Sequence, residues 1–171
     1  NFGLSGPLHF TGTVAAPGGN GSVTVASAGD VRLDTASGAL LGTVSVNSGN
    51  LAFDLDALPN LSHVDLTGTS RLTFTGAPRD LALTFGLHLP GTGGDTVGLF
   101  NNTSGALQLT TDLALTEGDP LRRSVVLIGG GSDLTLAGTL SGEASLTKVG
   151  AGNLTLNSTV AGWNTANSGA R

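Results

Sequence analysis

A repeat of about twenty residues restricts the fold of this chain more than any other feature. Pairs of apolar residues that flank a single residue recur at nearly even spacing along the chain. The pairs begin at Val31, Leu51, Leu72, Val97, Leu113, Leu134 and Leu154. The step from Leu72 to Val97 is longer than the others, and the next step, to Leu113, is shorter. Together they match two ordinary steps, so we interpret them as one insertion followed by one deletion.

Two further columns run in step with the first. A looser one contains Leu40, Leu61, Leu81, Phe100, Leu121, Leu140 and Val160. A second series of pairs has the same average step as the first and begins at Val23, Val44, Val64, Phe85, Leu107, Val125 and Leu146. A β-sandwich gives strands every 8–12 residues but fixes no phase between such columns. The pattern instead predicts coils of short strands, in which residues i and i+2 face inward and each coil pairs with the next.

The fold class that follows is all-β, a single right-handed parallel β-solenoid (β-helix) with about 20–21 residues per coil and seven to eight coils. Residues 1–171 form one domain in this interpretation, and we expect it to be a segment of a longer secreted chain. The nearly equal steps between Leu113, Leu134 and Leu154 predict that these leucines are buried and stacked in successive coils.

Aspartate or asparagine precedes the first-series pair in six of seven repeats, which predicts one stacked corner. The residues are Asp30, Asn50, Arg71, Asp95, Asp112, Asp133 and Asn153. Stacked carboxylates of Asp95, Asp112 and Asp133 would lie about 5 Å apart and raise one another's pKa. Stability would then fall as pH rises. Arg71, hydrogen bonds from turn N–H groups, or a bound cation could relieve this repulsion. These three aspartates are therefore the calcium candidates, and the sequence predicts no other metal ligand and no cofactor.

Composition excludes several function classes. Leu, Val and Thr beside 28 Gly favour short strands and turns. A net charge of −5, with no basic cluster larger than Arg122-Arg123, argues against nucleic acid. No apolar run reaches eighteen residues, so we expect no membrane insertion by this segment. The absence of cysteine excludes disulfides and thiol chemistry.

Catalytic patterns are weak, and we expect no enzyme. His9, His63 and His88 fall in different repeats, and neither Gly-x-Ser-x-Gly nor His-Glu-x-x-His occurs. Asp54 and Asp56 are the tightest carboxylate pair, for which a polar corner is the simpler interpretation. The glycine-rich stretches that end at Asp95 and Asp133 are similar to a calcium-binding nonapeptide, but that motif works by tandem repetition every nine residues. The lone tryptophan, Trp163, is expected to cap the last coil.

The stretch from Leu134 to Gly162 resembles the repeat of bacterial autotransporter passenger domains. That repeat has the form Leu-Thr-Lys-x-Gly-x-Gly-x-Leu-x-Leu. The matching residues here are Leu146, Thr147, Lys148, Gly150, Gly152, Leu154 and Leu156. The family's usual continuation, Asn-Thr-Tyr-x-Gly, is replaced by Val-Ala-Gly-Trp-Asn-Thr. The resemblance implies an extracellular β-helix on the bacterial cell surface, without implying a particular ligand.

The expected function is a non-enzymatic structural or adhesive segment of an autotransporter-like passenger, which presents Ser, Thr and Asn faces. Expected partners are other copies of the chain, end to end or side by side, and a host or cell-surface ligand. One alternative is a subunit of a self-assembling extracellular fibre or pilus, because uncapped end coils expose strand edges. The other is a solenoid enzyme acting on polysaccharides, which would need a groove with clustered carboxylates and arginines.

Overall fold

All regular structure in the described residues is β-strand. The computed structural model describes residues 8–10, 23–26, 29–33, 42–54, 61–77, 80–81, 86–88, 96–115, 125–142 and 145–161. Its strands belong to three sheets, and within each sheet every pair of neighbouring strands is parallel. The all-β, parallel-strand part of the prediction is therefore confirmed.

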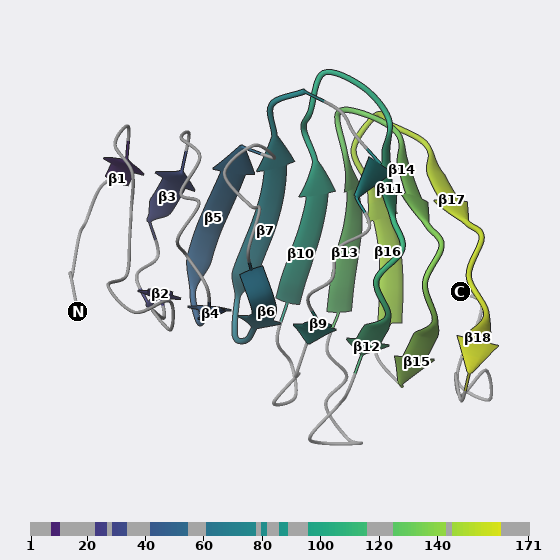
Figure 1. Cartoon of the computed structure of the whole chain (residues 1–171), viewed down its shortest axis with the longest axis horizontal. Helices are drawn as coiled ribbons and strands as arrows, with labels where there is room; N and C mark the ends of the chain where they lie inside the picture. Colours follow the sequence, from purple (N-terminus) through teal and green to yellow (C-terminus); the bar gives the residue numbers. More distant parts are fainter. Residues whose placement is uncertain are drawn as a thin grey trace.

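The first sheet forms the long row of arrows in Figure 1 and has seven strands in the described residues. They are β1 (Leu8–Phe10), β3 (Asp30–Leu33), β5 (Gly49–Asp54), β7 (Ser70–Thr75), β10 (Thr96–Asn101), β13 (Val125–Gly130) and β16 (Ser145–Val149). The second sheet, also seven-stranded in this part of the chain, contains β2 (Val23–Val25), β4 (Gly42–Val46), β6 (Leu61–Leu66), β9 (Gly86–His88), β12 (Leu113–Leu115), β15 (Leu140–Gly142) and β18 (Val160–Ala161).

The third sheet begins only after β7. Its four described strands are β8 (Asp80–Leu81), β11 (Leu107–Leu109), β14 (Leu134–Leu136) and β17 (Leu154–Leu156). From β1 to β6 the described strands alternate between the first and second sheets, and we call this stretch the two-sheet part. From β7 to β18 they visit the first, third and second sheets in turn, and we call this stretch the three-sheet part.

The spacing between paired strands changes where the third sheet enters. In the first sheet, Val31 pairs with Leu51 and Leu51 with Leu72, in agreement with the predicted coil length. Leu72 then pairs with Leu99 and Leu99 with Ile128, and both of these steps along the chain are clearly longer. The predicted insertion followed by a compensating deletion is therefore wrong. Two successive long steps occur instead. The following step, from Ile128 to Lys148, returns to the predicted coil length although that coil also contains three strands.

The predicted stack of Leu113, Leu134 and Leu154 is also wrong. Leu113 lies in the second sheet, where it pairs with Leu87 and Leu140. Leu134 lies in the third sheet, between Leu107 and Leu154. Leu113 and Leu134 are fully buried as expected, whereas Leu154 is half-buried. The Leu-x-Leu pattern identifies an inward-facing pair but carries no information on which sheet holds it.

The core consists of stacked inward-facing side chains. Leu51, Leu72, Leu99 and Ile128 occupy one inward column of the first sheet, and each has no exposed surface. The parallel inward column reads Leu33, Phe53, Phe74, Asn101 and Gly130. This second column changes from large apolar residues to Asn and Gly where the third sheet begins.

Asn101 makes the turn from the first sheet into the third. Its buried Nδ2 donates to the carbonyl oxygens of Gly105 (3.0 Å) and Asp133 (2.6 Å). Its Oδ1 accepts from the N–H (3.0 Å) and the hydroxyl (2.7 Å) of Thr103. Gly130, the next residue in the column, has a φ of 127°, and an added Cβ would collide with the backbone of Asn101. A polar turn thus replaces the phenylalanine of the two-sheet part.

The last strands are more exposed than the strands before them. Leu156 of β17 is 52% exposed, whereas Leu136, its partner in β14, is 1% exposed. Lys148 continues the inward column of Ile128, lies exposed, and donates a hydrogen bond to the carbonyl oxygen of Gly150. The predicted cap, Trp163, lies outside the described residues. No helix in the described ranges has the length and hydropathy needed to cross a membrane.

Candidate functional site

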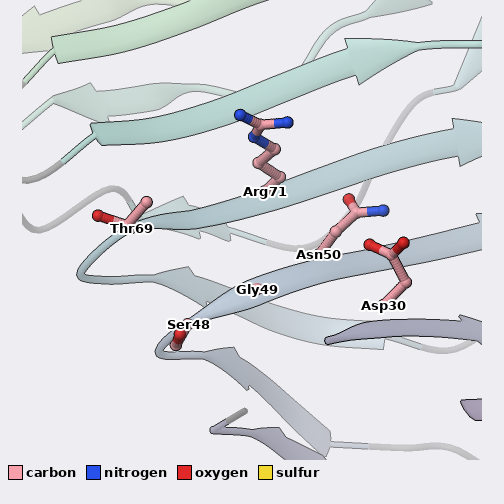
Figure 2. Close-up of a pocket in the computed structure, with 6 residues that line it drawn as sticks. All are labelled: Asp30, Ser48, Gly49, Asn50, Thr69 and Arg71. Atoms are coloured by element: carbon pink, nitrogen blue, oxygen red, sulfur yellow. The ribbon is translucent and has the colours of Figure 1, made fainter. Parts of the chain in front are cut away.

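An open pocket lies where β3, β5 and β7 begin. Its volume is about 350 Å³. Figure 2 shows its lining residues, which are Asp30, Ser48, Gly49, Asn50, Thr69 and Arg71. Five of these six residues carry a polar side chain, so the pocket is a candidate for binding a polar ligand.

Strand register places three of the lining residues in one row. Asp30 pairs with Asn50, and Asn50 pairs with Arg71. Each directly precedes an inward residue of the first sheet, so its side chain faces outward. Neighbouring strands lie about 4.8 Å apart, so the row spans roughly 10 Å from Asp30 to Arg71. The sequence predicted this part of the Asx column correctly.

The turns that lead into β5 and β7 supply the remaining lining residues. Ser48 is half-buried and Thr69 is exposed, and each precedes a strand of the first sheet. Gly49 has a φ of 83°, in the left-handed region that favours glycine. Its N–H donates to the carbonyl oxygen of Thr69 at 3.1 Å, which ties the two turns together. The N–H of Asn50 donates to the carbonyl oxygen of Gly29 at 3.3 Å and links the row to the turn before β3.

Two contacts hold the polar side chains of the row in place. The hydroxyl of Thr73, which is 9% exposed, donates to Oδ1 of Asn50 at 2.8 Å and orients the amide. The guanidinium carbon of Arg71 lies 5.7 Å from the centroid of the Phe100 ring, within the range of a cation–π contact. Both side chains are therefore positioned before any ligand arrives.

The charges of the pocket are opposite and separated. Asp30 and Arg71 are both exposed and lie two strands apart. Of the six lining residues, Asp30 alone carries a carboxylate. Because glycoside hydrolysis by the usual mechanism needs two carboxylates, these residues fit binding better than catalysis.

The three calcium candidates do not form the predicted acidic column. Arg71 pairs with Gly98, whereas Asp95 lies outside the described residues. Asp112 precedes a strand of the second sheet, and its carboxylate accepts from the N–H of Thr139 at 2.7 Å. Asp133 precedes a strand of the third sheet. The stacking of Asp112 on Asp133 is therefore wrong, because the third sheet places them at different corners.

Hydrogen bonds, and not repulsion from neighbouring carboxylates, determine the direction in which the pKa of Asp133 shifts. Its Oδ1 accepts from the backbone N–H of Asn153 at 2.8 Å and from Nδ2 of the same residue at 3.1 Å. These two bonds lower the pKa of Asp133, and the backbone bond has the larger effect. Desolvation opposes them, and the positive charge of Lys148 adds a smaller lowering. The predicted rise in pKa is wrong for Asp133. Hydrogen bonds hold its carboxylate, but their donors belong to Asn153 of the next coil and not to the turn of Asp133 itself.

The remaining candidates do not converge on a site. His9, His63 and His88 lie on β1, β6 and β9, in different places along the first and second sheets. Asp54 ends β5, and Asp56 lies outside the described residues. Among the residues with described positions, no three His, Asp or Glu side chains group as metal ligands. The calcium site stays a prediction.

Sequence reasoning missed the outer parts of the pocket. Ser48 and Thr69 belong to turns whose geometry no repeat pattern specifies. Phe100 was assigned to a column with Leu81 and Leu121, whereas it lies on the outer face of β10, beside Arg71. The inward pair Val97 and Leu99 already places Phe100 on the outer face by alternation, so its assignment to an apolar column conflicted with the first series.

Comparison with known proteins adds no relative: no family model, no curated protein and no solved structure matches this chain. The strand arrangement, the polar surface and the pocket are therefore the features that bear on function.

Proposed function

We propose that the chain is a non-enzymatic, extracellular adhesive segment built as a single right-handed parallel β-solenoid. The described strands suggest about seven coils, with a third side added from β7 onward. The supporting observation is that polar side chains on neighbouring strands bond to one another outside a continuous apolar core. Such ladders make a rigid, weakly charged surface, which suits binding rather than chemistry.

Three contacts illustrate the ladders. Thr67 donates to Asn47 at 3.1 Å in the turns that follow β6 and β4. Thr73 donates to Asn50 at 2.8 Å between β7 and β5. Asn153 donates to Asp133 at 3.1 Å beside β17 and β14. In each contact the two residues come from strands or turns that are neighbours in the stack, so the surface is held by the same repeat as the core.

The autotransporter-like identity and cell-surface location are part of this proposal. The resemblance lies in the stretch from Leu134 to Gly162, whose two Leu-Thr-Leu segments pair residue by residue as β14 and β17. Gly150, with a φ of 76°, and buried Gly152 lie against the backbone of the preceding coil. A side chain at either glycine of the motif would collide with the backbone of the preceding coil, so this fold requires glycine there, which supports the resemblance.

Adhesion can be tested with beads coated with the purified chain. Retention of the beads on epithelial cells should depend on the folded protein, with acid-unfolded protein as the control. Loss of retention together with purely monomeric behaviour in light scattering would contradict the proposal. Depolymerisation of an added polysaccharide would favour the enzyme alternative.

A fibre subunit is the second candidate, and the last strands favour it. Exposed Leu156 and half-buried Leu154 could be covered by a further coil. The two ends do not match, however, in the described residues. The first strands, β1 and β2, belong to two sheets, whereas the last three, β16, β17 and β18, belong to three. We propose both forms of self-association, end to end and side by side.

A further inference from the structure

We infer that the pocket at the start of β3, β5 and β7 binds a neutral oligosaccharide that runs across the strands. This inference rests on the proposed adhesive function and names the ligand class of one binding site. Its basis is the row of Asp30, Asn50 and Arg71 together with the hydroxyls of Ser48 and Thr69.

The hydrogen-bonding groups of the pocket are mixed in kind. The Asp30 carboxylate only accepts, the Arg71 guanidinium only donates, and the hydroxyls of Ser48 and Thr69 can do both. Asn50, whose Oδ1 is held by Thr73, contributes amide N–H donors. A sugar carries hydroxyls that each donate and accept, so successive hydroxyls can satisfy such a row whatever the order of donors and acceptors.

The dimensions and charges favour a neutral chain over a charged one. A row of roughly 10 Å, set by strands about 4.8 Å apart, accommodates two sugar rings placed end to end. Asp30 and Arg71 stand at opposite ends of the row. A polyanion would meet the Asp30 carboxylate, and a polycation would meet the Arg71 guanidinium. A neutral oligosaccharide can use both groups without repulsion from either.

Contacts beside the row reduce the free-energy cost of binding a ligand. Thr73 holds Asn50, Phe100 lies beside the Arg71 guanidinium, and backbone bonds from Gly49 and Asn50 join the three strands. Side chains already held in position lose less freedom when a ligand binds. The pocket is open and contacts one face of its ligand, so we expect a dissociation constant of about 1 mM for a single site. Several copies displayed together would strengthen attachment.

The test is NMR titration of the ¹⁵N-labelled chain with cellotetraose, maltotetraose and chitotetraose. At least one of these should shift the amides of residues 48–50 and 69–71 with a dissociation constant of about 1 mM, little changed by added salt. Asp30→Asn and Arg71→Ala should each weaken binding about tenfold, as expected for loss of a charge-assisted hydrogen bond. Lys148→Ala, which removes an exposed cation far from the pocket in sequence and sheet order, should leave binding unchanged.

Three results would overturn the inference: no shift of these amides by any probe at about 10 mM, binding that Arg71→Ala leaves intact, or binding of a sulfated oligosaccharide in place of the neutral ones. Bead adhesion separates this inference from the proposed function. Full adhesion by the Arg71→Ala chain would overturn this pocket as the adhesive site and leave the adhesive function standing. Saccharide binding without any adhesion to cells would overturn the adhesive function and leave the pocket standing.

Discussion

The two-sheet part and the three-sheet part use the same apolar repeat but fill their interiors differently. In the two-sheet part, Leu33 and Phe53 extend inward from the first sheet, and Phe74 ends this apolar run. In the three-sheet part, the same column continues as Asn101 and Gly130. The interior there is filled by buried leucines of the third sheet, which are Leu107, Leu109, Leu134 and Leu136. The side chains of one inward column thus become smaller where the stack changes from two sheets to three.

The surface changes at the same place. The outward row of Asp30, Asn50 and Arg71 continues as Gly98 and Leu127 in the three-sheet part. The row thus has no polar side chain at Gly98 and Leu127, and it has one again at the exposed Thr147. The candidate binding pocket belongs to the two-sheet part and the first strand beyond it, whereas the paired Leu-Thr-Leu segments of β14 and β17 belong to the three-sheet part.

The largest loss of stability is expected at Phe74, the last large apolar residue of the inward column. Phe74 has no exposed surface, so Phe74→Ala should lower the free energy of unfolding by about 3–5 kcal/mol through lost burial and a cavity. Phe100→Ala is the matched control, because Phe100 lies on the outer face and is only half-buried. Urea denaturation measures both variants. Equal losses would mean that Phe74 does not fill the interior.

The polar turn of the three-sheet part should be nearly as sensitive. Asn101→Ala removes four hydrogen bonds and leaves the buried N–H of Thr103 without its acceptor. The carbonyl oxygens of Gly105 and Asp133 keep one donor each, the Thr103 hydroxyl and the Leu107 N–H. We expect a loss of about 3 kcal/mol, since each unsatisfied buried group costs about 1–3 kcal/mol. Asn102→Ala, at an exposed position whose Oδ1 accepts one bond from Gly131, should cost less than about 1 kcal/mol. A near-neutral Asn101→Ala would contradict the role given to this turn.

A smaller change in the free energy of unfolding, in the stabilising direction, is expected at Ser70, where the two-sheet part meets the three-sheet part. The hydroxyl oxygen of Ser70 is buried and has no hydrogen-bond partner within the described residues. Ser70→Ala should therefore raise the free energy of unfolding by about 1 kcal/mol. Thr103→Val, which removes a buried hydroxyl that does have partners, should lower it. Thermal unfolding of the two variants tests the contrast, and destabilisation by both would show that Ser70 has a partner.

The smallest effect concerns acid stability, which we assign to the three-sheet part. The pKa of Asp133 is lowered from its ordinary value of 3.8, so its ionised form is favoured by folding. Its contribution to stability is fully present above the unfolded pKa and is lost as pH falls through the folded pKa. Asp133→Asn should therefore flatten the acid side of a stability–pH profile. An unchanged profile between about pH 2 and pH 5 would count against these hydrogen bonds.

The sequence predicted much of the two-sheet part. The columns Val31–Leu51–Leu72 and Val23–Val44–Val64 are paired as expected. These residues could be aligned because the coils of this part have nearly the same length and each contains one strand of each sheet. The outward row of the candidate pocket followed from the same alignment, since each of its members directly precedes an inward residue.

The three-sheet part could not be assigned in the same way. Leu107, predicted in the second series with Val64, lies in the third sheet, and Val125 and Leu146 of that series lie in the first. Alternation of apolar and polar residues is identical in all three sheets, so the pattern does not identify the sheet. Asn101 and Gly130 stand in the inward column where large apolar residues are expected, and they mark the turns that follow β10 and β13.

A cysteine cross-link tests the third sheet most directly, because the chain contains no cysteine of its own. Gln108 pairs with Thr135 in the structure, whereas a uniform repeat would place Ala114 beside Thr135. Neighbouring strands bring Cα atoms within the range of about 4.4–6.8 Å that a disulfide bridges. The chain with Gln108→Cys and Thr135→Cys should cross-link on mild oxidation without loss of fold, and the chain with Ala114→Cys and Thr135→Cys should not. Cross-linking of the second pair and not the first would contradict the change from two sheets to three.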